Sequence, residues 1–136
     1  MSTKIDPASP SKPLLWSSYI LSGLAILFLI FDSAVKVIQS PLAVEPTTGL
    51  GYAANLVMII GLIELACLIL YAIPYTSVLG AVLLTGYLGG AVASNLRADM
   101  PTFNIIFPFI IAGLVWGGLY LREQRLRQLL PFRSNP

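Results

Sequence analysis

Histidine is absent from this chain, and cysteine occurs only once, as Cys67. Without an imidazole the chain has no His-based metal site and no histidine to ligate haem. A single thiol cannot form an internal disulfide or a CxxC redox pair, so we expect Cys67 to pack as a small hydrophobic residue. The sequence also contains no Walker loop and no dinucleotide fingerprint. We therefore predict no catalytic residues, no metal and no cofactor, and any electron transfer would depend on a partner protein or a bound lipophilic carrier.

Charged side chains are scarce as well. They make up 10% of the residues, while 57% are hydrophobic, and soluble domains carry about 25% charged residues. The polar residues are too few to cover the surface of a soluble domain. Four apolar stretches reach the length of about 20 residues that a membrane-spanning helix needs, at residues 14–38, 52–73, 75–96 and 102–121. We therefore predict an all-α integral membrane protein, an antiparallel four-helix transmembrane bundle.

The segments outside these stretches carry the residues expected of loops and tails. Ser40, Pro41 and Pro46 mark a first loop, and Pro74 alone separates the second span from the third, which predicts a tight hairpin. Residues 1–13 contain three prolines and several serines and are predicted to form a disordered cytoplasmic tail. Residues 123–136 are predicted to form a basic amphipathic cytoplasmic tail that contacts anionic headgroups.

The distribution of lysine and arginine predicts the orientation. Cationic residues flank both ends of the four-span region, and the connecting loops on the opposite side have only Lys36 and Arg97 at their edges. The flanking residues are Lys4, Lys12, Arg122, Arg125, Arg127 and Arg133. By the positive-inside rule we predict both termini in the cytoplasm and the protein in the cell (inner) membrane. An aromatic belt is expected at the same interface, formed by Trp16, Tyr19, Tyr71, Tyr75, Trp116 and Tyr120.

Glu64 is the least expected residue in the chain, because no other charge lies in its apolar stretch. A carboxylate inside a bilayer costs a few kcal/mol and is usually paired or functional. With this topology, Glu64 lies about 18 Å below the outer surface, and the other polar groups of the spans lie above it in the outer half. Almost no acidic, basic or amide side chains of this kind are expected in the inner half. The candidate ligand-binding or buried polar cluster consists of Asp32, Lys36, Asn55, Glu64, Asn95, Arg97 and Asn104.

Proline and glycine add to this interpretation. Pro108 leaves the carbonyl of Asn104 without its helical partner, which is tolerated in a membrane only where protein or water reaches it. Two small-x-x-x-small motifs, Gly86/Gly90 and Gly113/Gly117, favour close packing of helices within the chain over oligomerisation.

The apolar stretches also resemble a known family. Lys36, the segment 61–64 (GLIE), the string 84–91 (LTGYLGGA) and the string 116–122 (WGGLYLR) are similar to the DoxX-like family of small four-helix bacterial membrane proteins. The resemblance extends over about residues 14–122. It implies the four-helix fold and an association with quinone-linked oxidoreductases. Relatives often have histidine at the position of Asn95, so the resemblance does not extend to proton handling by an imidazole there.

Three functions are compatible with these features. The first is a non-catalytic subunit or scaffold of a membrane redox or envelope complex, in which the buried charges fix the helix register. The second is a binding protein for a quinone-like or isoprenoid-like molecule, or another lipid, held by the polar cluster. The third, a proton or ion relay through Glu64, is the least favoured because no inverted repeat is visible. The predicted partners are the lipid bilayer and an oxidoreductase or other membrane protein, with no nucleic acid and an open oligomeric state.

Overall fold

The computed structural model describes residues 11–132. Every regular element in this part of the chain is a helix. The elements are α1 (Lys12–Val37), α2 (Pro41–Gly49), α3 (Leu56–Ala72), the 3₁₀ turn η1 (Pro74–Thr76), α4 (Ser77–Arg97), α5 (Thr102–Arg122) and α6 (Gln124–Leu129). Residues 1–10 and 133–136, which include most of the predicted N-terminal tail, Lys4 and Arg133, lie outside the described residues.

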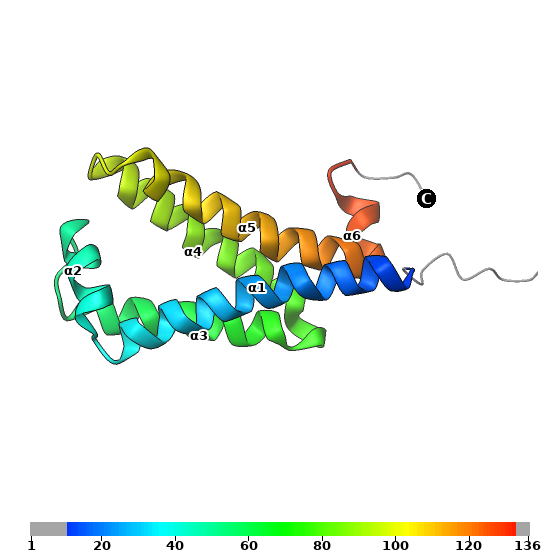
Figure 1. Ribbon diagram of the computed structural model, residues 1–136, viewed down its shortest axis with the longest axis horizontal. Helices are drawn as coiled ribbons and strands as arrows, with labels where there is room; N and C mark the ends of the chain where they lie inside the picture. Colours follow the sequence, from blue (N-terminus) through cyan, green and yellow to red (C-terminus); the bar gives the residue numbers. More distant parts are fainter. Residues whose placement is uncertain (1–10, 133–136) are drawn as a thin grey trace, which may run out of the picture.

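The long helices pack in a closed cycle. Helix α1 contacts α3 and α5, and α4 contacts the same two helices from the other side. Figure 1 shows α1 and α3 running together, α4 and α5 running together, and the two pairs diverging toward the end that carries α2. The start of α1, the end of α5 and the short helix α6 lie at the opposite end. The polar cluster predicted from the sequence therefore falls at the divergent end.

Three helical segments are long and apolar enough to cross a membrane, namely Lys12–Val37, Pro74–Arg97 and Thr102–Arg122. Helix α3 is shorter than predicted. It has 17 residues, or about 25 Å of helix, because residues 52–55 of the predicted span are not helical. The all-helical prediction and the membrane prediction are confirmed. The spans at α1, α4 and α5 begin and end within two residues of the predicted limits.

The predicted first loop is not a plain loop, because it contains helix α2. The oxygen of the Ser40 side chain accepts a hydrogen bond from the Leu42 backbone N–H at 3.3 Å, and Pro41 follows as the first helical residue. A serine cap followed by proline is a helix-start signal, so the same two residues that indicated a loop begin a helix. Ala43 and Thr47 of α2 are buried, and this helix lies across the wide end of the structure.

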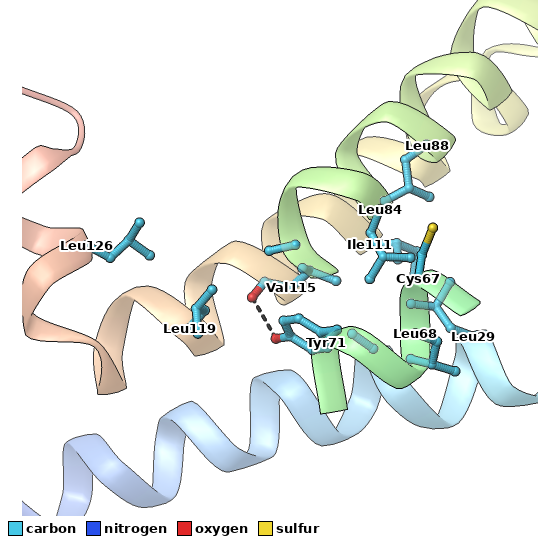
Figure 2. Close-up of a cluster of buried hydrophobic side chains, with 12 residues drawn as sticks. Leu29, Cys67, Leu68, Tyr71, Leu84, Leu88, Ile111, Val115, Leu119 and Leu126 are labelled. Carbon is cyan, nitrogen blue, oxygen red and sulfur yellow. Dashed lines mark hydrogen bonds between the residues drawn. The ribbon is translucent and has the colours of Figure 1, made fainter. Parts of the chain in front are cut away.

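Buried apolar side chains from all four long helices form the core. Figure 2 shows Leu29, Leu68, Leu84 and Val115 converging from different helices. Cys67 is buried among them as a free thiol, as predicted. These side chains form one continuous core that joins the four long helices.

The glycines that permit close helix packing are not the predicted ones. A Cβ atom at Gly61 would lie 2.6 Å from the Lys36 Cβ, and one at Gly118 would lie 2.9 Å from the Ser18 carbonyl oxygen. At Gly86, Gly90 and Gly113 an added Cβ would meet no atom within 4 Å, and at Gly117 it would meet only Leu21 at 3.5 Å. The prediction that the two small-x-x-x-small motifs pack helices within the chain was wrong for Gly86, Gly90 and Gly113, which contact no other helix, whereas Gly117 lies against Leu21 of α1.

The exterior of the long helices is apolar. Only 22% of the apolar window of α1 is buried inside the protein, so most of its hydrophobic side chains require another apolar environment. Trp16 and Tyr75 of the predicted aromatic belt are 69% and 100% exposed. Tyr71 does not belong to that belt: it is 1% exposed, and its hydroxyl donates to the Val115 carbonyl oxygen at 2.7 Å (Figure 2).

Candidate functional site

Lys36 is the centre of a buried polar network. Its ammonium nitrogen has three donors, and each has a partner: Asp32 Oδ2 at 2.5 Å, Glu64 Oε2 at 2.9 Å and Tyr87 Oη at 2.6 Å. The side chain is 13% exposed. The four residues come from α1, α3 and α4, so one cation joins three helices. We call Asp32, Lys36, Glu64 and Tyr87 the Lys36 network.

Glu64 is the most deeply buried member of this network, at 0% exposed. Its Oε2 accepts from Lys36 Nζ and from Tyr87 Oη, both at 2.9 Å. Its Oε1 is also buried, and no atom of residues 11–132 donates to it. A buried carboxylate oxygen without a donor is costly. The network therefore contains one unfilled acceptor.

Gly61 explains how Lys36 and Glu64 meet. It lies one turn before Glu64 on α3, and a Cβ there would also lie 3.0 Å from the Val37 backbone nitrogen and 3.1 Å from the Ser33 carbonyl oxygen. Only glycine allows α3 to approach the backbone of α1 this closely. The close approach places Glu64 within reach of a lysine side chain that starts from the neighbouring helix.

A cavity of about 380 Å³ lies beside the network. Its polar side is formed by Asp32, Lys36, Glu64 and Tyr87, and its apolar side by residues of α1, α2, α4 and α5. The apolar lining includes Phe28, Leu88, Ala91, Phe103, Phe107 and Ile111. We call it the outer cavity, because the sequence analysis predicts its polar residues in the outer half of the bundle. It is large enough for the head and the first segment of a small amphipathic molecule.

Five of the seven residues predicted from the sequence line the outer cavity: Asp32, Lys36, Glu64, Asn95 and Asn104. The Asn95 amide donates to the Ala91 carbonyl oxygen at 2.7 Å, which leaves its side-chain oxygen available. Asn104 is exposed in the first turn of α5, one turn before Pro108, which lines the same cavity.

The other two residues lie outside the cavity. Arg97 is exposed and its guanidinium donates to the Leu50 carbonyl oxygen, so it ties the end of α4 to the segment after α2. Asn55 is exposed at the start of α3 and its side chain does not cap that helix.

Comparison with protein families matches residues 20–118 to the DoxX-like family. The match covers more than half of the chain. The chain belongs to the DoxX-like family. No curated protein and no solved structure gave a match.

Sequence reasoning about this DoxX-like protein missed Tyr87 as a site residue. Tyr87 lies in the middle of α4, whereas tyrosines of membrane helices are enriched at the interfaces. A hydroxyl so far from the interface needs a partner in the protein. The sequence therefore indicated that Tyr87 needs a partner. It did not indicate which residues the partners are, because Glu64 and Lys36 lie on other helices.

A second polar network lies at the opposite end of the helices. Arg122 donates to Ser22 Oγ at 2.6 Å, Ser22 pairs with Tyr71 Oη at 2.7 Å, and the Tyr71 hydroxyl donates to the Val115 carbonyl oxygen. Serine and tyrosine are common in membrane helices, so the sequence did not mark these residues. The prediction concerned acidic, basic and amide side chains within the spans, so it did not cover this network of hydroxyl groups and the flanking Arg122.

The Lys36 network has an excess of acid. When all groups are ionised, two carboxylates face one ammonium, so the site favours a ligand that donates hydrogen bonds. Among the described residues no group of three or more histidine, cysteine, aspartate or glutamate side chains is arranged to hold a metal ion. The arrangement is therefore suited to binding a polar head in an apolar setting.

Proposed function

We propose that this DoxX-like membrane protein is a four-span bundle that binds a small amphipathic molecule in the outer cavity. The head of the ligand donates a hydrogen bond to Glu64, and its apolar body lies against the aromatic side chains of α1 and α5. A quinol or an isoprenoid alcohol has this chemistry. In this proposal the chain is not an enzyme on its own and presents or stores the lipophilic molecule.

The unfilled acceptor of Glu64 supports this proposal most directly. Glu64 lines the cavity and is 0% exposed, and its Oε1 has no donor among residues 11–132. A structural ion pair alone would be expected to occupy both oxygens, because a buried unpaired acceptor costs about 1–3 kcal/mol. A hydroxyl of a bound ligand would remove that cost.

The remainder of the lining supports an amphipathic ligand over a polar one. Phe28 and Phe107 stack edge to face, with their ring centroids 4.9 Å apart, and they form part of the cavity wall. Aromatic walls favour a ring or an unsaturated chain over a hydrated ion. Asn104 at the mouth would contact the second polar group of a quinol.

The test is retention of a defined ligand, ubiquinol or a polyprenol, by the purified full chain in detergent, measured by native mass spectrometry. Glu64→Gln preserves the side-chain shape and removes the charge. It is expected to weaken retention about tenfold, because a hydrogen bond to a charged acceptor is worth about 1–1.5 kcal/mol more than one to a neutral acceptor. Glu45→Gln is the matched control, because Glu45 is exposed on α2 and does not line the cavity, and it should leave retention unchanged.

Asn104→Leu is a second variant for the same test. It changes an exposed residue at the cavity mouth, so the fold should be retained while affinity falls. Equal retention by the wild type, Glu64→Gln and Asn104→Leu would refute the binding proposal.

A scaffold role is the second candidate, because the Lys36 network joins α1, α3 and α4. In that role the network fixes helix register, and a membrane oxidoreductase packs against the apolar exterior. Glu64→Gln would then destabilise the fold without any ligand being involved. A relay through Glu64 remains the least favoured alternative.

We also propose that the protein lies in the cytoplasmic membrane with both termini in the cytoplasm. The cationic residues near the ends of the chain support this orientation. It places the outer cavity toward the side opposite the cytoplasm.

A further inference from the structure

We propose that the end of the molecule formed by the start of α1 and the end of α5 holds a second site, which binds the headgroup of a phosphatidylethanolamine. Arg122 would bind the phosphate and Glu123 the ammonium. The site lies in a second cavity, which we call the inner cavity. It is separate from the outer cavity and lies at the other end of the helices, so the inference does not depend on the proposed function.

Arg122 is a fixed cation without an anionic partner. Its guanidinium donates to Ser22 Oγ at 2.6 Å and to the Ser18 carbonyl oxygen at 3.4 Å, and it lies 5.6 Å from the centre of the Tyr19 ring. No carboxylate of residues 11–132 lies within ion-pair distance of it, since Lys36 forms both ion pairs found in this part of the chain. The guanidinium has five N–H donors, so some of them remain available.

The hydrogen bonds behind Arg122 fix its orientation. The Tyr71 hydroxyl donates to the Val115 carbonyl oxygen, so its oxygen must accept from Ser22. The Ser22 oxygen then accepts from Arg122. The hydroxyl hydrogens of Ser22 and Tyr71 therefore point away from the Arg122 guanidinium. This series of hydrogen bonds stabilises the positive charge without neutralising it.

The inner cavity has a volume of about 440 Å³, and Arg122 and Glu123 both line it. They do not pair with each other, and no hydrogen bond to the Glu123 carboxylate is found within the described residues. A cavity with one unpaired cation and one unpaired anion is complementary to a zwitterion. Ser77, the first residue of α4, lies at the same cavity, so the positive end of that helix dipole adds to the attraction for a phosphate.

The surroundings indicate a lipid as the source of this headgroup. Gly23, Ile26 and Leu119 give the cavity an apolar side, which would contact the glycerol backbone and the start of an acyl chain. Tyr19 and the fully exposed Tyr75 lie at this end of the helices, where aromatic residues of membrane proteins meet the headgroup region. The Glu123 carboxylate disfavours a purely anionic headgroup and accepts hydrogen bonds from an ammonium, which a choline group cannot donate.

The test compares palmitoyl-oleoyl phosphatidylethanolamine with phosphatidylglycerol and phosphatidylcholine of the same chains, bound to the purified full chain and measured by native mass spectrometry. Wild type is expected to retain phosphatidylethanolamine best. Arg122→Gln should weaken its retention about tenfold, because a charge-assisted contact to the phosphate is lost. Glu123→Gln should remove the preference for phosphatidylethanolamine over phosphatidylglycerol. Arg125→Gln, on the exposed side of α6, is the matched control and should leave the retention of phosphatidylethanolamine unchanged.

Gly23→Leu keeps both charges and fills the inner cavity, since a Cβ at Gly23 meets no atom within 4 Å. It should abolish lipid retention in a folded protein, which separates loss of the site from loss of the fold. Equal retention of all three lipids, equal effects of Arg122→Gln and Arg125→Gln, or displacement of the lipid by soluble phosphoethanolamine at equal concentration would overturn the proposal.

Discussion

Replacing Lys36 with methionine tests whether the Lys36 network holds the helices together. Methionine has nearly the same length and volume, so the change removes the charge and three donors with little change in packing. Asp32, Glu64 and Tyr87 then lose their contacts at 2.5, 2.9 and 2.6 Å. The largest effect falls on Glu64, which is fully buried and keeps only the hydroxyl of Tyr87 as a donor.

The expected cost follows from the burial of the two partners. Removing one member of a buried ion pair costs about 3–5 kcal/mol, because the other charge remains buried without compensation. Most of this cost is assigned to Glu64. Asp32 is 31% exposed, so water stabilises its charge, and its share is below about 1 kcal/mol.

The assay is thermal unfolding of the purified chain in detergent, followed by tryptophan fluorescence. Trp116 reports on the packing of α4 against α5, because its ring N–H donates to Thr85 Oγ1 at 2.6 Å. Lys36→Met should lower Tm by on the order of 10 °C. Adding Glu64→Gln should restore at least half of this loss, while adding Asp32→Asn should restore little.

A double-mutant cycle gives the result that would refute this reasoning. If the losses of Lys36→Met and Glu64→Gln are strictly additive, the two residues do not interact energetically. If Asp32→Asn restores as much of the stability lost in Lys36→Met as Glu64→Gln does, burial of the unpaired carboxylate does not determine that loss.

Two further predictions concern packing and topology. Gly61→Ala should destabilise the protein by about 1–3 kcal/mol in the same unfolding assay, because the added methyl group would lie 2.6 Å from the Lys36 Cβ. Gly113→Ala is the control and should be neutral or stabilising, because its methyl group would meet no atom within 4 Å. Alkaline phosphatase fused to the C-terminus should be inactive and a cytoplasmic reporter active at the same position, because the basic residues favour the cytoplasm; phosphatase activity there would reverse the topology.

Hydropathy alone predicted the class of this protein, because the length and apolar character of a span are local properties. The limits of α1, α4 and α5 follow from where apolar runs end. The ends of α1 and α4 also have a local basis, since Gln39 and Asp99 adopt the left-handed conformation that terminates helices. Glu64 stood out for the same reason: a charge in an apolar run is visible without any knowledge of its neighbours.

Only the tertiary structure decided which polar groups meet. The rotation of each helix about its axis determines whether Gly61 or Gly86 faces a neighbour, and hydropathy does not encode that rotation in a chain whose helices are apolar on every side. The same applies to Tyr87, whose partners lie on other helices, and to Arg122, whose serine partner is 100 positions away. Contacts between helices depend on the packing of the whole chain. Both cavities lie between packed helices, so the sequence did not reveal them.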